Sequence, residues 1–153
     1  MNFRDLQLRI SEFESGKIVI VGLGNPIRQD DGAGLVLLEE LRKRKIVKGA
    51  KYIAAGTTPE NFLGKIVAYS PQIVLFIDTV RMNAKPGSIM EIPVDEIASQ
   101  GFSTHSYSIK LIEKYLRSEG IEQYIYIGIE LENMGLAESL SPAVKAGINA
   151  FFQ

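Results

Sequence analysis

The residues of this sequence best suited to chemistry are two aspartates and the single histidine. Asp31 follows an apolar run that ends at Leu23, and Asp78 directly follows the apolar run Ile73–Ile77. His105 lies in a third segment, at the expected start of a helix. Two carboxylates and one imidazole can form a three-ligand site for a borderline divalent metal such as nickel, zinc or manganese. The sequence has no cysteine, so thiolate ligands, disulfides and a cysteine nucleophile are excluded.

Each of these residues also has an ordinary structural explanation. Asp30 and Asp31 stand where a helix begins, so one of them is expected to cap that helix while the other faces a crevice. His105 alone would more often be a structural histidine, although the dipole at a helix N-terminus favours the neutral imidazole that binds metals. Asp78 could cap the turn over residues 83–87. A carboxylate at the end of an apolar strand costs several kcal/mol unless it is paired or metal-bound, so Asp78 is the most informative of these residues.

Other uses of the same segments are less well supported. Hydroxyl residues surround His105, but the chain has no Gly-x-Ser-x-Gly elbow for a Ser-His-Asp triad. Gly22 and Gly24 suggest a dinucleotide fingerprint, yet Ile27 occupies the position of its third glycine, and two aspartates would repel a pyrophosphate. The segment Val21–Pro26 resembles the opening motif of peptidyl-tRNA hydrolase, but the catalytic histidine of that loop is missing here.

Alternating helices and strands must position these residues. Apolar, β-branched runs predict buried parallel strands, and a run that follows its predecessor too closely for a crossover helix predicts an antiparallel edge strand. The expected parallel strands cover residues 17–23, 51–55, 73–77 and 124–129, and the edge strand covers 88–92. Helices are expected within residues 1–16, from Asp31 to about residue 45, and over 59–69, 104–120 and 141–151. This order predicts an α/β fold: a three-layer α/β/α domain of phosphorylase/hydrolase-like type with a five-stranded, mostly parallel sheet. Residues 1–16 would form an amphipathic extension, and 17–153 a single α/β domain.

Ligands of such sheets bind beyond the carboxyl ends of the strands. The connections after the first three strands therefore predict one crevice lined by Asp31, Thr57 and Asp78. His105 would join them if its helix begins at the same edge.

Composition narrows the possible partners. The 153 residues are 46% hydrophobic, which suits one domain with a substantial core. Seventeen basic residues balance 18 acidic ones, for a net charge of −1, so no global positive field favours nucleic acid or an anionic membrane. No apolar run approaches the roughly 20 residues of a membrane span, and the N-terminus does not look like a targeting signal. We therefore expect a cytoplasmic protein with no membrane insertion and no nucleic-acid partner.

The motifs together resemble those of the hydrogenase maturation endopeptidases (peptidase family M52). The branch concerned processes the large subunit of formate-hydrogenlyase-type and related energy-converting nickel-iron hydrogenases. The resemblance covers roughly residues 17 to 150. It is carried by Gly22-x-Gly24-Asn25 with Asp30-Asp31-Gly32-Ala33-Gly34, Gly56-Thr57-Thr58-Pro59-Glu60-Asn61, Ile77-Asp78, Pro86-Gly87, Thr104-His105, Gly128-Ile129 and Leu140-Ser141-x-x-Val144.

This resemblance implies an aspartyl-type endopeptidase that removes a C-terminal extension from a nickel-iron hydrogenase large-subunit precursor after nickel insertion. Asp31, Asp78 and His105 correspond to the nickel-recognising ligands and are the catalytic candidates, with the general base unassigned. The nickel would be supplied by the substrate rather than bound tightly by this chain alone. The supporting loop residues would be Gly24, Asn25, Asp30, Gly32, Gly56 and Thr57.

Two departures from the family pattern leave an alternative open. Many members have an aspartate at the end of the second strand, discussed as a catalytic acid, where this sequence has Ala54. The alternative is therefore a non-catalytic nickel-sensing or assembly module on the same fold. The family does not generally need residues 1–16, and both a partner contact and core packing are compatible with them.

Overall fold

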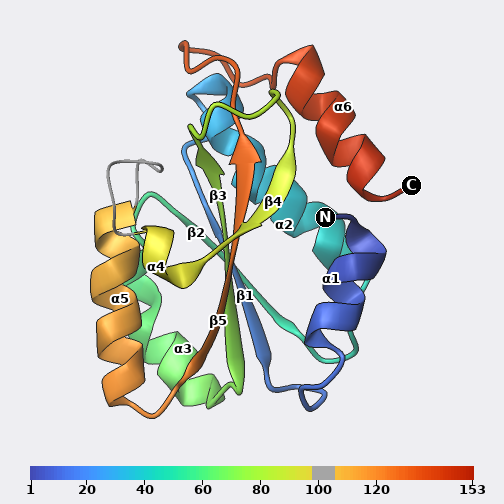
Figure 1. The fold of residues 1–153 in the computed structure, drawn as a ribbon. Helices are drawn as coiled ribbons and strands as arrows, with labels where there is room; N and C mark the ends of the chain where they lie inside the picture. Colours follow the sequence, from blue (N-terminus) through green and yellow to red (C-terminus); the bar gives the residue numbers. More distant parts are fainter. Residues whose placement is uncertain (98–105) are drawn as a thin grey trace.

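A five-stranded sheet forms the middle layer of the molecule (Figure 1), within residues 1–97 and 106–153, which the computed structural model describes. The strands are β1 (Ile18–Leu23), β2 (Lys51–Gly56), β3 (Ile73–Val80), β4 (Ile89–Ile92) and β5 (Gln123–Glu130). Their order in the sheet is β2-β1-β3-β5-β4. The first four in this order are parallel, and β4 pairs antiparallel with β5 at the edge. The predicted α/β fold and its antiparallel edge strand are confirmed.

Helices cover both faces of the sheet, so the chain forms three layers (Figure 1). The elements outside the sheet are α1 (Phe3–Ile10), the 3-10 turn η1 (Gln29–Gly32), α2 (Ala33–Lys43), the 3-10 turn η2 (Pro59–Phe62), α3 (Leu63–Tyr69), α4 (Val94–Ile97), α5 (Ser106–Ser118) and α6 (Pro142–Phe151). One core cluster joins the sheet to α1, α2 and α6, and the other joins it to α3, α4 and α5. None of the described helices has the length and apolarity that a bilayer crossing requires.

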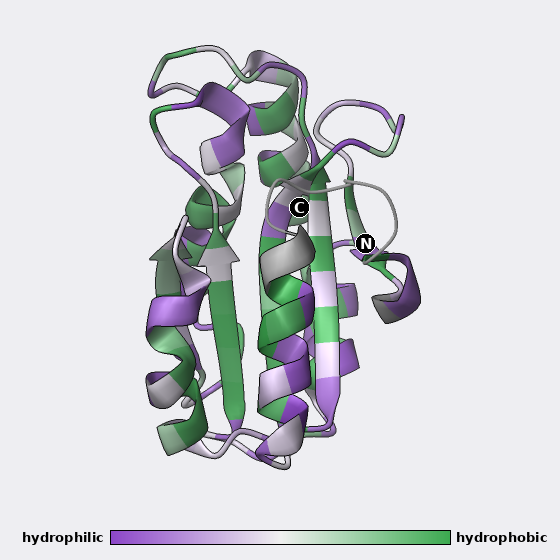
Figure 2. Cartoon of the chain, turned by 90° about the vertical axis from the view of Figure 1, so that its left-hand side faces the viewer, coloured by the Kyte–Doolittle hydropathy of each residue, from purple (hydrophilic) through white to green (hydrophobic). Residues whose placement is uncertain are grey.

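The strand sequences explain their places in the sheet. Every residue of the central strands β1 and β3 is buried, as expected for β-branched runs covered by helices on both sides. Along β3, Leu75 and Ile77 face the α2 side, while Val74 and Phe76 face the α5 side. Figure 2 shows one strand of the sheet coloured as hydrophobic along nearly its whole length, whereas helices carry both hydrophobic and hydrophilic segments.

Several element boundaries differ from the sequence-based expectation. The first helix ends at Ile10 rather than Gly16, and residues 11–16 form turns that lead into β1. Strand β3 continues past Asp78 to Val80, because β5 offers it pairing partners as far as Glu130. The helix expected from residue 59 begins as the 3-10 turn η2, and the short helix α4 was not predicted.

Helix α1 packs on the same core as α2 and α6. Its Leu6 and Ile10 are fully buried. A reciprocal pair of hydrogen bonds between Asn2 and Asp5 caps its N-terminus, and the Gln7 amide donates to the carbonyl oxygen of Ile46 at 3.0 Å. Among the alternatives for residues 1–16, the structure thus shows core packing directly.

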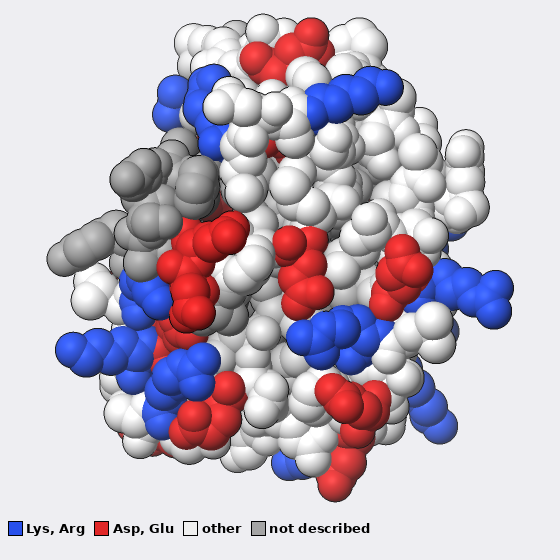
Figure 3. Space-filling view, viewed as in Figure 1, with Lys and Arg blue, Asp and Glu red and all other residues white. Residues whose placement is uncertain are grey.

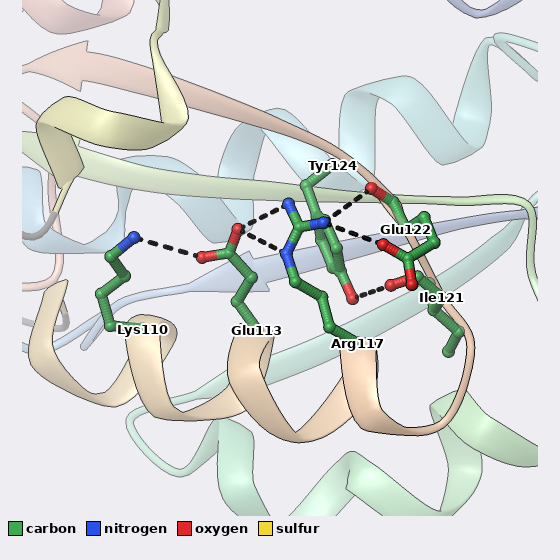
Figure 4. A network of polar contacts seen from close by, with 6 residues as sticks. All are labelled: Lys110, Glu113, Arg117, Ile121, Glu122 and Tyr124. Atoms are coloured by element: carbon green, nitrogen blue, oxygen red, sulfur yellow. Dashed lines mark hydrogen bonds and ion pairs between the residues drawn. The ribbon is translucent and has the colours of Figure 1, made fainter.

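A polar network joins α5 to the start of β5, at the end of the sheet away from the candidate site (Figure 4). The buried carboxylate of Glu113 accepts hydrogen bonds from the guanidinium of Arg117 at 3.0 and 3.3 Å and lies 3.5 Å from the Lys110 ammonium. Arg117 also donates to Glu122 and lies over the ring of Tyr124. A buried charge of this kind needs such partners, and the network fixes the turn between the two elements.

Candidate functional site

The connection that follows β1 meets the ends of β2 and β3 at the carboxyl edge of the sheet. The Gly24 amide donates to the carbonyl oxygen of Gly56 at 2.9 Å, which joins this connection to the last residue of β2. The Thr79 hydroxyl donates to Oδ1 of Asp31 at 3.0 Å, which joins the first connection to β3. Since Thr79 directly follows Asp78 in β3, the loop that carries Asp31 meets the strand that carries Asp78 at the same edge of the sheet.

Asp31 is held in one position by the loop that contains it. It lies in η1, is 2% exposed, and accepts a hydrogen bond from the Asn25 amide through both its carbonyl oxygen and Oδ2, each at 3.1 Å. Gly24 makes this closure possible: its φ is +137°, and a Cβ there would lie 2.0 Å from the Asp31 carbonyl oxygen. The glycine-rich loop therefore fixes a carboxylate at the sheet edge.

Asp78 is an internal residue of β3 and is 4% exposed. It pairs in register with Gly128 of β5, and its Oδ1 accepts a hydrogen bond from the Thr79 amide at 2.8 Å. By strand alternation its side chain belongs to the α5 side of the sheet. The turn over residues 83–87, which Asp78 could have capped, is bound instead by Glu130, whose carboxylate accepts from the Ala84 amide.

Neither aspartate caps α2, contrary to the sequence-based expectation. The N-cap of α2 is Gly32, which makes no side-chain bond. The fully buried carboxylate of Asp30 instead accepts hydrogen bonds from the amides of Glu132 and Asn133 and from both the amide and the hydroxyl of Ser141, at 2.7–3.0 Å. Ser141 is the N-cap of α6 as predicted, but its hydroxyl donates to Asp30 rather than capping its own helix.

These hydrogen bonds control the ionisation of Asp30. Burial disfavours the carboxylate, but the donors from Asn133, Ser141 and Glu132 outweigh it and hold the pKa of Asp30 below its usual value. Asp30 is thus an ionised group that joins the loop after β1 to the loop after β5.

Main-chain hydrogen bonds join the same two loops over several residues. The Gln29 amide donates to the carbonyl oxygen of Ala137 at 2.8 Å, and the Ala137 amide donates to that of Ile27 at 3.0 Å. The amide of Gly135 donates to Oε1 of Gln29 at 2.7 Å. Sequence reasoning missed this pairing, and the only signal for it was the cluster of turn-forming residues after β5.

The remaining predicted residues occupy different places. Gly56, with φ of +62°, is the last residue of β2, and the exposed Thr57 follows it at this edge. Ala54 lies in β2 opposite Gly22 and is exposed. His105 lies outside the described residues. In the sequence it directly precedes α5. Within the described ranges, no three histidine, aspartate or glutamate residues gather into a metal site.

Comparison with known proteins identifies the family of this chain. Residues 35–153 match the family model for hydrogenase maturation proteases of the HycI type. The chain therefore belongs to the hydrogenase maturation protease family, whose members are peptidases.

Individual relatives agree with this assignment. The hydrogenase 3 maturation protease of Escherichia coli is 29% identical over 137 residues, which cover 88% of this chain and 86% of that protein. The crystal structure of the NiFe hydrogenase maturation protease HycI from Thermococcus kodakarensis superposes with a TM-score of 0.80 at 26% identity, over 95% of this chain and 92% of that one. A crystal structure of a hydrogenase 3 maturation protease superposes with a TM-score of 0.74 at 27% identity. The match covers 88% of this chain and 85% of that one.

Proposed function

We propose that this protein is a cytoplasmic endopeptidase that removes the C-terminal extension of a nickel-iron hydrogenase large-subunit precursor after nickel has been inserted. Its membership in the maturation protease family supports the peptidase activity. The observation that carries the proposal is the position of Asp31 at the carboxyl edge of the sheet, where its buried carboxylate accepts a hydrogen bond from Thr79, the residue that follows Asp78 in β3.

In this proposal the nickel ion belongs to the substrate. Asp31, Asp78 and His105 supply oxygen and nitrogen ligands, and the chain has no cysteine to hold nickel firmly by itself. A metal already held by the precursor would complete its coordination on these residues. Cleavage would then depend on nickel insertion, because an empty precursor could not make this contact.

The contact with nickel positions the scissile bond. A metal ion in this place polarises the peptide carbonyl or an attacking water, and fixed ligands hold the reacting groups in place. Asp31 suits this role because Thr79 and Asn25 already orient its carboxylate before any substrate arrives. The proton lost by the attacking water must go to a nearby base, for which Asp31, Asp78 and His105 are the candidates.

Intact-mass spectrometry of a hydrogenase large-subunit precursor tests the proposal. We expect the protein to release one discrete C-terminal peptide from the nickel-loaded precursor and none from the nickel-free form. Asp31→Asn should lower the cleavage rate at least a hundredfold while the protein stays folded, because the amide keeps the size of the carboxylate but is a poor metal ligand. Glu12→Gln, the same chemical change at an exposed position, should cleave like the wild type. Cleavage that ignores nickel, or survives Asp31→Asn, would refute the proposed nickel contact.

Ala54 favours the second candidate, a non-catalytic nickel-sensing or assembly module. It occupies an exposed strand position where many family members have an aspartate. If the protein binds the nickel-loaded precursor but leaves its mass unchanged, this second function is the correct one. Restoration of cleavage by Ala54→Asp would then identify the missing group.

A further inference from the structure

Two large apolar side chains are exposed on the joined loops at the carboxyl edge of the sheet. Leu136 is 86% exposed and Ile27 is 49% exposed. The Ala137 amide donates to the Ile27 carbonyl oxygen, so the backbones that carry these side chains run side by side. We call this pair the edge patch.

The edge patch sits on a rigid base. The side-chain oxygen of Gln29 accepts from the Gly135 backbone amide at 2.7 Å, and the backbone amide of Gln29 donates to the carbonyl oxygen of Ala137 at 2.8 Å. Below them, the four hydrogen bonds to Asp30 hold both loops against the start of α6. An apolar surface that is ordered before binding loses little conformational entropy when a partner covers it.

The edge patch is also continuous with the proposed site. Ile27 and Asp31 belong to the same short loop, in which the Asp31 amide donates to the carbonyl oxygen of Arg28 at 3.1 Å. Both joined loops lie at the end of the sheet toward which the arrows of β3 and β5 point (Figure 1). A protein substrate that brings its metal centre to Asp31 therefore approaches the loop that carries Ile27 and is hydrogen-bonded to the loop of Leu136.

On the face drawn in Figure 3, the described residues form no large patch of one charge that could bind a protein substrate instead of the edge patch. Acidic and basic side chains are interspersed there, without a broad field of one sign. Local apolar contacts near the site are then the better basis for recognising a large partner.

We propose that Ile27 and Leu136 form a docking patch for the folded protein substrate, and that they bury an apolar surface of the precursor beside its scissile segment. This inference rests on the proposed function and extends it from the reacting bond to the body of the substrate. The edge patch acts on binding, so it sets the KM for the precursor and leaves the chemical step at Asp31 and Asp78 unchanged.

The test compares Ile27→Ser, Leu136→Ser and the double variant with the control Leu8→Ser. Leu8 is 66% exposed on α1, which packs beside the sheet away from the joined loops (Figure 1). Time courses of intact mass on the nickel-loaded precursor give KM and kcat, and the thermal midpoint reports folding. We expect Leu136→Ser to raise KM about tenfold or more, the double variant to raise it further, and kcat and the thermal midpoint to stay unchanged. Leu8→Ser should match the wild type in all three.

Failure of the edge patch and failure of the proposed function give different results. If the wild type cleaves and the edge-patch variants have its KM, the docking patch is refuted while the protease stands. If the wild type binds the precursor without cleaving it, Leu136→Ser must weaken that binding tenfold, as measured by calorimetry, or the docking patch is refuted as well. A wild type that neither cleaves nor binds refutes both proposals. A dimer in sedimentation that Leu136→Ser converts to monomer would assign the edge patch to a second copy and overturn the proposal.

Discussion

Asp30 and Asp31 are adjacent and buried, yet their carboxylates serve different parts of the molecule. Asp31 turns toward β3, where Thr79 donates to it, and stays at the sheet edge. Asp30 turns toward the loop after β5 and the start of α6. Asp30 is thus a structural anchor, and Asp31 is a candidate metal ligand. Substitution of Asp30 should therefore change stability, and substitution of Asp31 should change activity.

Replacement of Asp30 should make stability less dependent on pH. Because the folded pKa of Asp30 lies below that of the unfolded chain, ionised Asp30 stabilises the fold fully above about pH 5. This contribution is lost as the pH falls through about 4 toward the folded pKa. We expect Asp30→Asn to cost about 2 kcal/mol at pH 7, since an amide cannot accept all the donors around it. Urea unfolding at pH 7 and pH 3 should show a smaller loss of stability on acidification in the variant than in the wild type; equal losses would contradict this role for Asp30.

At the scale of elements, the first turn of α2 lies directly on the ends of two central strands. A Cβ at Gly34 would lie 2.4 Å from the carbonyl oxygen of Leu23 and 2.9 Å from that of Ile77. No side chain fits between a helix and strand backbones at this distance. Gly34 therefore sets the distance between α2 and the strand ends that carry the candidate site.

Gly34→Ala should force α2 away from the sheet. We expect a loss of about 3 kcal/mol, because the clash is with backbone atoms that cannot move aside. Gly64→Ala is the matched control: Gly64 lies in α3 with nothing near its missing Cβ, so alanine should stabilise the protein by about 0.5–1 kcal/mol. Chemical denaturation measures both changes. If Gly34→Ala and Gly64→Ala had equal stability, the prediction that the close packing of α2 on the strand ends requires a glycine at position 34 would be wrong.

At the scale of the whole molecule, the N-terminal helix belongs to the core that supports the sheet. Leu6 and Ile10 are fully buried beside residues of α2 and α6. Phe3 packs against Phe151 and Phe152, so the two ends of the chain contact each other. The helix thus completes the core on the side of the sheet covered by α2 and α6.

Leu6→Ala should therefore lower the free energy of unfolding by about 2–5 kcal/mol, because it leaves a cavity in a packed core. The control on the same helix is Leu8→Ala, whose side chain is 66% exposed and should change stability by less than about 0.5 kcal/mol. Thermal or urea unfolding compares the two variants. Leu6→Ala as stable as Leu8→Ala would show that α1 is not part of the cooperative core.

The candidate site could be predicted in part. Strands that end at Leu23 and near Asp78 follow from the apolar runs, and parallel strands place their carboxyl ends at one edge, so the meeting of these segments follows from topology. The partner of Asp31 did not follow, because Thr79 lies 48 residues away and nothing local marks it as a donor. The edge patch was equally hidden, since Leu136 in sequence looks like any other leucine.

The sequence by itself determined the class of fold, the antiparallel edge strand and the family, because hydrophobic periodicity, turn residues and short motifs are local properties of a chain. Only the tertiary structure decided which buried aspartate binds which loop, how closely α2 approaches the strands, and that residues 3–10 complete the core. Those outcomes depend on contacts between segments that are distant in sequence. Asp30, for example, acquires its four hydrogen bonds only when the loop after β5 folds over it.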